Sequence, residues 1–198
     1  NEAQQKGKFI SEITKIGDCE TDENIRPNST MEKLDSLKLA FDQNGTVTAA
    51  TSSPLTDGAA ATLICEENFA KENALEILGR IKSTAVEGCD PNYMGLGPIA
   101  ATRKALERAK LSIKEIDIVE LNEAFAAQAL YVIREGGWDQ NKINLNGGAI
   151  ALGHPLGCSG ARIFTTLLHE MKRKDIRYGL ATLCVGVGQG ISTVVELM

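Results

Sequence analysis

Three segments of the sequence place reactive polar side chains among glycines, where an apolar core would not need them. They are Asn122–Phe125, Gly147–Arg162 and Cys184–Gly190. An imidazole can accept a proton, a thiol can act as acid, base or nucleophile, and backbone N–H groups can stabilise a developing oxyanion. The last segment, a thiol followed by glycines, is typical of an acyl-transfer site.

The second segment holds His154, one of only two histidines in the chain. Pro155 follows it and disfavours helical geometry at His154, which predicts a loop whose imidazole faces a cleft. Taken alone, His154 fits a structural histidine equally well. His169 lies in a predicted helix beside Glu170 and is interpreted as a surface residue.

Cys184 ends a predicted strand and leads directly into the glycine-rich run, so its thiol would lie among exposed backbone N–H groups. An inert buried cysteine is the alternative interpretation. Cys158 is a rival nucleophile, because a thiol near a helix N-terminus has a lowered pKa.

The glycines of Gly147–Arg162 do not form a nucleotide-binding loop. The segment contains neither G-x-x-x-x-G-K-[ST] nor G-x-G-x-x-G with an acidic residue at the expected distance. We interpret them as residues that permit tight turns and close backbone approach.

Composition excludes several classes of protein. The 198 residues carry a net charge of −5 and a pI near 5.2, which argues against a nucleic-acid surface. Five cysteines without a C-x-x-C pair predict no zinc site and indicate a reduced, cytoplasmic protein. The chain begins without a signal-peptide core, has no membrane-spanning stretch, and is expected to be part of a longer protein.

Strands and helices alternate along most of the chain. The sequence predicts a helix within Asp57–Asn73, a strand over Gly79–Gly88 and a helix with Pro98 in its first turn. Ser112 and Glu115 form a capping-box pattern. The other expectations are β-favouring residues at 8–16, a strand at 117–121, and two antiparallel strands at 179–185 and 190–197. Helices are expected at 123–135, where Gly136 and Gly137 stop the helix, and at 159–173. This order predicts an α/β layered domain, with helices covering a mixed sheet.

The three segments also carry a family resemblance. Asn122–Ala126, Gly147–Arg162 and the Cys184-x-Gly-x-Gly-x-Gly pattern resemble, in order and spacing, the three C-terminal signatures of the thiolase family. The likeness extends upstream through residues 45–49 and 57–60. It implies a thiolase-like layered fold, with residues 1–75 as a remnant of the loop and N-terminal domain and 76–198 as the C-terminal domain.

By this resemblance His154 would be the base that activates a nucleophilic cysteine of the other half, and Cys184 the second catalytic cysteine. Asn122 would hold a water that stabilises the thioester enolate, and the Gly186 N–H would face the tetrahedral intermediate. Ser53 resembles the serine that touches the pantetheine arm of coenzyme A.

The resemblance also implies substrates and partners. Acyl-CoA and CoA would be substrates, with no cofactor and no metal, and the whole protein would be a homo-oligomer that binds neither membrane nor nucleic acid. This chain alone would be inactive, because the nucleophile would lie in the missing half. At Val187 and at Thr51–Ser53 the sequence resembles the pattern of the 3-ketoacyl-CoA thiolases of bacterial fatty-acid oxidation more than that of the biosynthetic acetoacetyl-CoA thiolases. A non-catalytic protein that binds acyl-CoA or lipid is the alternative.

Overall fold

The computed structural model describes all 198 residues, and its sheet lies entirely within residues 79–198. Four strands are ordered β1-β4-β3-β2, with β2 parallel to β3 and the other pairs antiparallel. The predicted α/β class and the antiparallel pairing of the last two strands are confirmed. The strands are β1 (Gly79–Gly88), β2 (Ile118–Leu121), β3 (Tyr178–Val185) and β4 (Gln189–Leu197).

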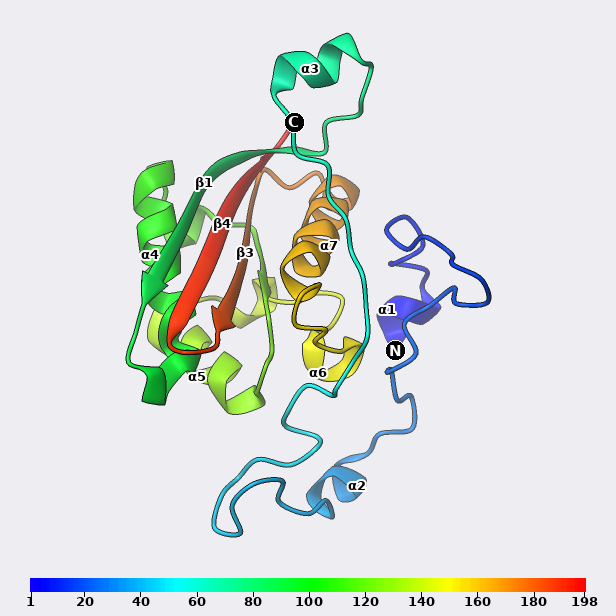
Figure 1. The fold of residues 1–198 in the computed structure, drawn as a ribbon, viewed down its shortest axis with the longest axis vertical. Coiled ribbons are helices and arrows are strands. Elements are labelled where there is room, and N and C mark those ends of the chain that lie inside the picture. Colours follow the sequence, from blue (N-terminus) through cyan, green and yellow to red (C-terminus); the bar gives the residue numbers. More distant parts are fainter.

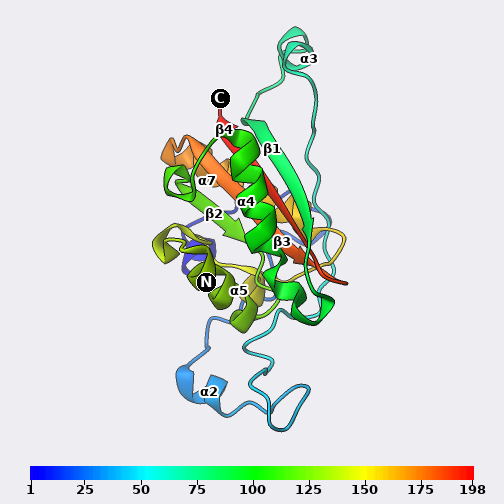
Figure 2. The same cartoon turned by 90° about the vertical axis from the view of Figure 1, so that its left-hand side faces the viewer.

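Helices cover both faces of this sheet, so the domain has three layers (Figures 1 and 2). Helices α4 (Gly97–Ala109) and α5 (Ala126–Gly136) lie on one face, and α7 (Ser159–Lys174) lies on the other. Because side chains alternate along a strand, Val119 joins the core beneath α4 and α5, while Ile118 joins the core beneath α7.

The remaining elements are short. Of these short elements, only the helix α6 lies within one of the three segments that the sequence predicts to be functional. They are the helices α1 (Glu2–Gln5), α2 (Met31–Asp35), α3 (Glu67–Glu72) and α6 (Ala149–Leu152), and the 3-10 turns Pro91–Leu96, Ile113–Glu115 and Gln140–Lys142. None of the helices combines the length and the hydrophobicity needed to cross a bilayer.

Several predicted signals act as expected. Pro98 lies in the first turn of α4, and Gly137 closes α5 in the left-handed conformation at φ 65°. The Ser112 N–H donates to the Glu115 carboxylate at 2.8 Å, although this capping box encloses a 3-10 turn. Helix α5 begins at Ala126, later than predicted, because residues 122–125 form the connection that carries Asn122.

Two early predictions are wrong. Residues 8–12 form turns, 13–15 have no regular structure and Ile16 makes only an isolated bridge to Cys19, so no strand forms there. Of the helix expected at 57–73 only α3 exists. Residues 57–66 have no regular structure, and Leu63 and Ile64 are 73% and 69% exposed. A helix there would need a surface against which to bury its apolar face, and these residues find none.

Candidate active site

Asn122 and His154 meet at the end of strand β2. Asn122 directly follows β2, is fully buried, and its backbone N–H donates to the Thr182 carbonyl of β3 at 3.0 Å. Its side-chain Nδ2 lies 3.3 Å from His154 Nε2. The Asn122 Oδ1 is buried without a protein partner. A polar atom of this kind is suited to an ordered water, as the sequence prediction requires.

His154 is held by contacts from several segments. It follows the turn after α6, where Gly153 has a φ of 112° that favours glycine. The His154 backbone N–H donates to Thr56 Oγ1 at 3.3 Å, and its Nδ1 lies 2.6 Å from Ser159 Oγ. Burial, and secondarily the charge of Arg162, lowers the pKa of His154 below its usual value. The imidazole is therefore neutral at neutral pH and able to accept a proton.

Cys184 lies at the same end of the sheet, close to where the parallel strands β2 and β3 end. Strands β2 and β3 are parallel, and Cys184 stands two residues beyond Thr182, the partner of the Asn122 backbone N–H. Its side chain is 7% exposed, and burial is the main cause that raises the pKa of the thiol. Cys184 is thus a protonated thiol at neutral pH, able to donate a proton.

The hairpin after Cys184 leaves a backbone donor free. Gly186 is exposed, and its N–H makes no backbone hydrogen bond in the turn between β3 and β4. Val187 and Gly188 follow with φ of 69° and 88°. An N–H of this kind can stabilise an oxyanion, which agrees with the role that the resemblance implies for Gly186.

Ser53 packs against the Asn122 segment from the first part of the chain. Its N–H and Oγ both donate to the Ala124 carbonyl, at 3.0 and 3.2 Å, and Ala126 N–H donates to the Thr51 carbonyl at 2.8 Å. Ser53 is therefore brought to the site, and its contact with coenzyme A stays a prediction.

Cys158 does not have the expected lowered pKa. It precedes α7 as its N-cap and is buried, and desolvation raises the pKa of its thiol. Burial is the largest cause and outweighs the opposing charge of Arg162, so Cys158 is a poor candidate for the nucleophile.

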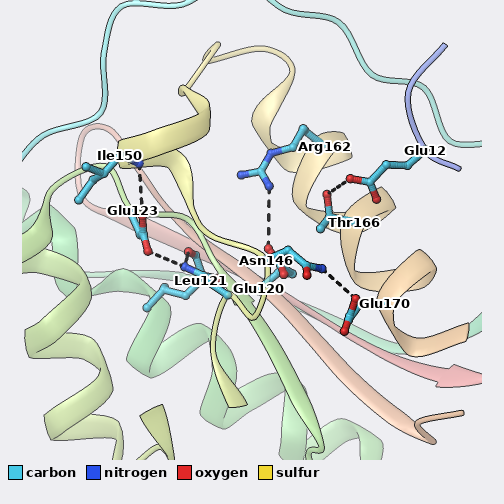
Figure 3. Close-up of polar contacts among 10 residues, drawn as sticks. Glu12, Glu120, Leu121, Glu123, Asn146, Ile150, Arg162, Thr166 and Glu170 are labelled. Carbon is cyan, nitrogen blue, oxygen red and sulfur yellow. Dashed lines mark hydrogen bonds and ion pairs between the residues drawn. The ribbon is translucent and has the colours of Figure 1, made fainter. Parts of the chain in front are cut away.

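Sequence reasoning missed two residues that shape the site. Thr56 accepts the His154 N–H, as described above. The Glu123 carboxylate accepts from Asn144 Nδ2 at 2.9 Å. It also accepts from the Ile150 N–H at 3.3 Å (Figure 3). A Cβ on Gly148 would lie 2.2 Å from the Glu123 carboxyl carbon. Two features of the sequence could have predicted this contact. They are the acidic residue of the Asn122–Phe125 segment and the adjacent glycines 147 and 148.

Two family models match the chain. One, described as "Thiolase, C-terminal domain", matches residues 75–197, and the other, "Thiolase, N-terminal domain", matches residues 1–68. Residues 69–74 lie between the two matches.

Similar proteins carry consistent names. A 3-ketoacyl-CoA thiolase of Vibrio parahaemolyticus is 60% identical over 179 residues, which cover 88% of this chain and 46% of that protein. One of Klebsiella pneumoniae is 54% identical over 207 residues, covering 98% of this chain and 54% of the relative. The chain thus spans about half the length of the curated relatives it matches.

Solved structures agree over the whole chain. The Bacillus anthracis acetyl-CoA acetyltransferase superposes with a TM-score of 0.94 at 43% identity, and the human mitochondrial 3-ketoacyl-CoA thiolase with 0.93 at 41%. Each comparison covers 100% of this chain and 52% of the other.

Proposed function

The chain belongs to the thiolase family, and on that premise we propose that it provides the carboxy-terminal half of a 3-ketoacyl-CoA thiolase. Such an enzyme transfers an acyl group between coenzyme A and 3-ketoacyl-CoA thioesters. The observation that carries the proposal is the contact between Asn122 and His154 at the sheet edge where Cys184 also lies.

The proposed chemistry begins with His154. Its neutral imidazole takes the proton of a nucleophilic cysteine that lies outside these 198 residues. The thiolate adds to the C3 carbonyl of the substrate, and the Gly186 N–H helps to stabilise the resulting oxyanion. The bond between C2 and C3 then breaks, which leaves an acyl-enzyme thioester and the enolate of acetyl-CoA.

Asn122 and Cys184 act on that enolate. A water held by the free Asn122 Oδ1, together with His154, stabilises the enolate oxygen. The protonated Cys184 gives its proton to the enolate carbon, releasing acetyl-CoA, and the resulting thiolate deprotonates an incoming CoA. The CoA thiolate attacks the acyl-enzyme and leaves as the shortened acyl-CoA, and the expelled cysteine thiolate takes back the proton held by His154. In the reverse, synthetic direction Cys184 takes the α-proton of acetyl-CoA.

The substrate class follows from the relatives. The two bacterial relatives described above are named 3-ketoacyl-CoA thiolases, in agreement with the features at Val187 and Thr51–Ser53. We therefore propose degradation of 3-ketoacyl-CoA esters longer than acetoacetyl-CoA, with Ser53 at the pantetheine arm. We also propose that the protein is cytoplasmic, because none of its five cysteines is paired. That it is a homo-oligomer is proposed on the family resemblance.

The test is a thiolysis assay on two forms of the protein. One is the 198-residue chain alone. The other, here called the completed chain, carries the amino-terminal half of the Vibrio parahaemolyticus relative in front of it. We expect loss of acetoacetyl-CoA and of a longer 3-ketoacyl-CoA only with the completed chain, and faster loss of the longer ester. Cleavage by the chain alone would show that one of its own cysteines is the nucleophile.

Variants of the completed chain test the assigned roles. His154→Ala and Cys184→Ala should each lower kcat by about 10²- to 10⁴-fold, the usual contribution of a general acid or base. His169→Gln is the matched control, because His169 lies on α7 away from the segments that form the site. Full activity of the Cys184→Ala variant would refute the proton-transfer role of that thiol.

A further inference from the structure

We propose that Ser159 is a positioning residue that holds His154 in the tautomer with its proton on Nδ1, so that Nε2 keeps the lone pair needed by a base. The inference rests on the proposed function, because it concerns how His154 is prepared for that role. Neither composition nor the motif assigns any task to Ser159 beyond starting helix α7.

The first argument is the contact at Nδ1. Ser159 is fully buried, and its Oγ lies 2.6 Å from His154 Nδ1. The same Oγ lies 3.0 Å from the Pro155 carbonyl oxygen, which accepts its hydroxyl proton. A hydroxyl has one proton and two lone pairs, so a Ser159 that donates to Pro155 is free to accept the proton of Nδ1.

The second argument comes from the other ring nitrogen. Asn122 Nδ2 is a donor and lies 3.3 Å from Nε2, closer than the 3.5 Å to Nδ1. Because Nδ2 is almost equally far from both ring nitrogens, it lies beside the ring and not along the Nε2 lone pair. This contact therefore leaves the Nε2 lone pair free and is compatible with the tautomer that the Ser159 contact favours. A neutral histidine has one ring proton, so placing it on Nδ1 leaves Nε2 able to accept the proton of a thiol.

Helix α7 is itself tied to the strand that carries Asn122. Arg162 lies one turn beyond Ser159, and its Nη1 is 3.9 Å from Oε2 of the buried Glu120, two residues before Asn122 (Figure 3). Glu120 Oε1 and Arg162 Nη1 have no hydrogen-bond partner. The contact lies between the strand that ends just before Asn122 and the helix that begins at Ser159.

The tautomer can be measured directly by nitrogen NMR of the chain labelled with ¹⁵N-histidine. The sequence has only two histidines, so His169→Gln assigns the signals. We expect the proton on Nδ1 in the native chain, a mixture or the opposite tautomer in Ser159→Ala, and the native pattern in Ser159→Thr, which keeps a hydroxyl. A proton on Nε2 in the native chain would overturn the proposal, since Ser159 would then donate to Nδ1. The tautomer measured in the native chain tests the proposal even if the Ser159→Ala variant fails to fold.

The second readout is the thiolysis activity of the completed chain. Ser159→Ala should lower kcat by at least about tenfold with little change in KM, and Ser159→Thr should restore most of the loss. An altered tautomer with unchanged kcat would overturn the positioning role. An inactive completed chain, or an unaffected His154→Ala variant, would instead refute the proposed function while leaving the NMR result intact.

Discussion

Residues 1–78 and 79–198 differ sharply in how they are stabilised. Here they are called the amino-terminal region and the sheet domain. The amino-terminal region contains only three short helices and two of the 42 buried residues, Phe9 and Ala70. The sheet domain contains all four strands and both apolar cores. The sheet domain can therefore position side chains through its own core, whereas the amino-terminal region depends on contacts with its neighbour.

Those contacts are mostly polar and gather near the site. Thr56 binds the His154 backbone, Ser53 binds the Ala124 carbonyl, and Glu12 accepts from Thr166 of α7 at 3.0 Å (Figure 3). The sheet domain therefore carries the candidate catalytic side chains, and the amino-terminal region borders them. The side chains of Leu55, Leu63 and Ile64 are exposed. Exposed apolar side chains of this kind are typical of a surface that another protein segment covers.

The comparison is tested most strongly by truncating one leucine side chain in each region. Leu180→Ala removes a fully buried side chain of β3 and should lower the free energy of unfolding by about 2–5 kcal/mol. Leu63→Ala, at a position that is 73% exposed, should change it by less than roughly 0.5 kcal/mol. Urea denaturation measures both. Equal effects would contradict the division between a packed domain and a surface-bound region.

A buried acid within the sheet domain should make its stability depend on pH. Burial raises the pKa of Glu120 from 4.5 to about 8, although Arg162 opposes the shift. The unfolded chain releases this proton near pH 4.5 and the folded chain only near 8, so stability falls as pH rises between these values.

Glu120→Gln removes this titration. The variant should match the native chain near pH 5 and exceed its stability near pH 8 by roughly 1–3 kcal/mol. Chemical denaturation at the two pH values provides the comparison. Parallel stability curves for the two proteins would show that Glu120 is ionised in the folded state.

The docking of the amino-terminal region should respond to a second acid. Burial raises the pKa of Glu12 to about 7, so docking of its segment onto α7 is favoured by the protonated form and weakens as pH rises from 4.5 to 7. Trypsin cleavage within residues 1–26, expressed relative to Glu12→Gln at each pH, should therefore increase with pH by several-fold. Glu20→Gln, at an exposed position, is the matched control. A ratio that does not vary with pH would argue against this docking contact.

The smallest effect is expected at an exposed turn of the sheet domain. Val187 is 82% exposed and has a φ of 69°, which is strained for a β-branched residue. Val187→Gly relieves the strain but adds freedom to the unfolded chain, so we expect a gain of no more than about 1 kcal/mol. Thermal unfolding measures it, with Val185→Ala, at the 39% exposed end of β3, as the control. A clear loss of stability in the glycine variant would show that Val187 makes a contact that outweighs its strain.

Much of the sheet domain could be predicted because its signals are local. The sequence predicted β1 and the last two strands, Pro98 and Gly137 marked helix ends, and the motifs around Asn122, His154 and Cys184 matched one family. Residues 57–66 misled the prediction, because alanine-rich composition favours a helix only where a surface exists to bury one face.

The sequence by itself determined which side chains could carry the chemistry, since residue type and spacing fix reactivity and family. The tertiary structure decided how they meet. It brought Asn122 to His154 across 32 residues of chain, placed Thr56 and Ser159 against the imidazole, and buried Cys158 so that its thiol stays protonated. Such contacts depend on how β2, α6 and α7 pack together, and burial sets the pKa of each group only after that packing exists.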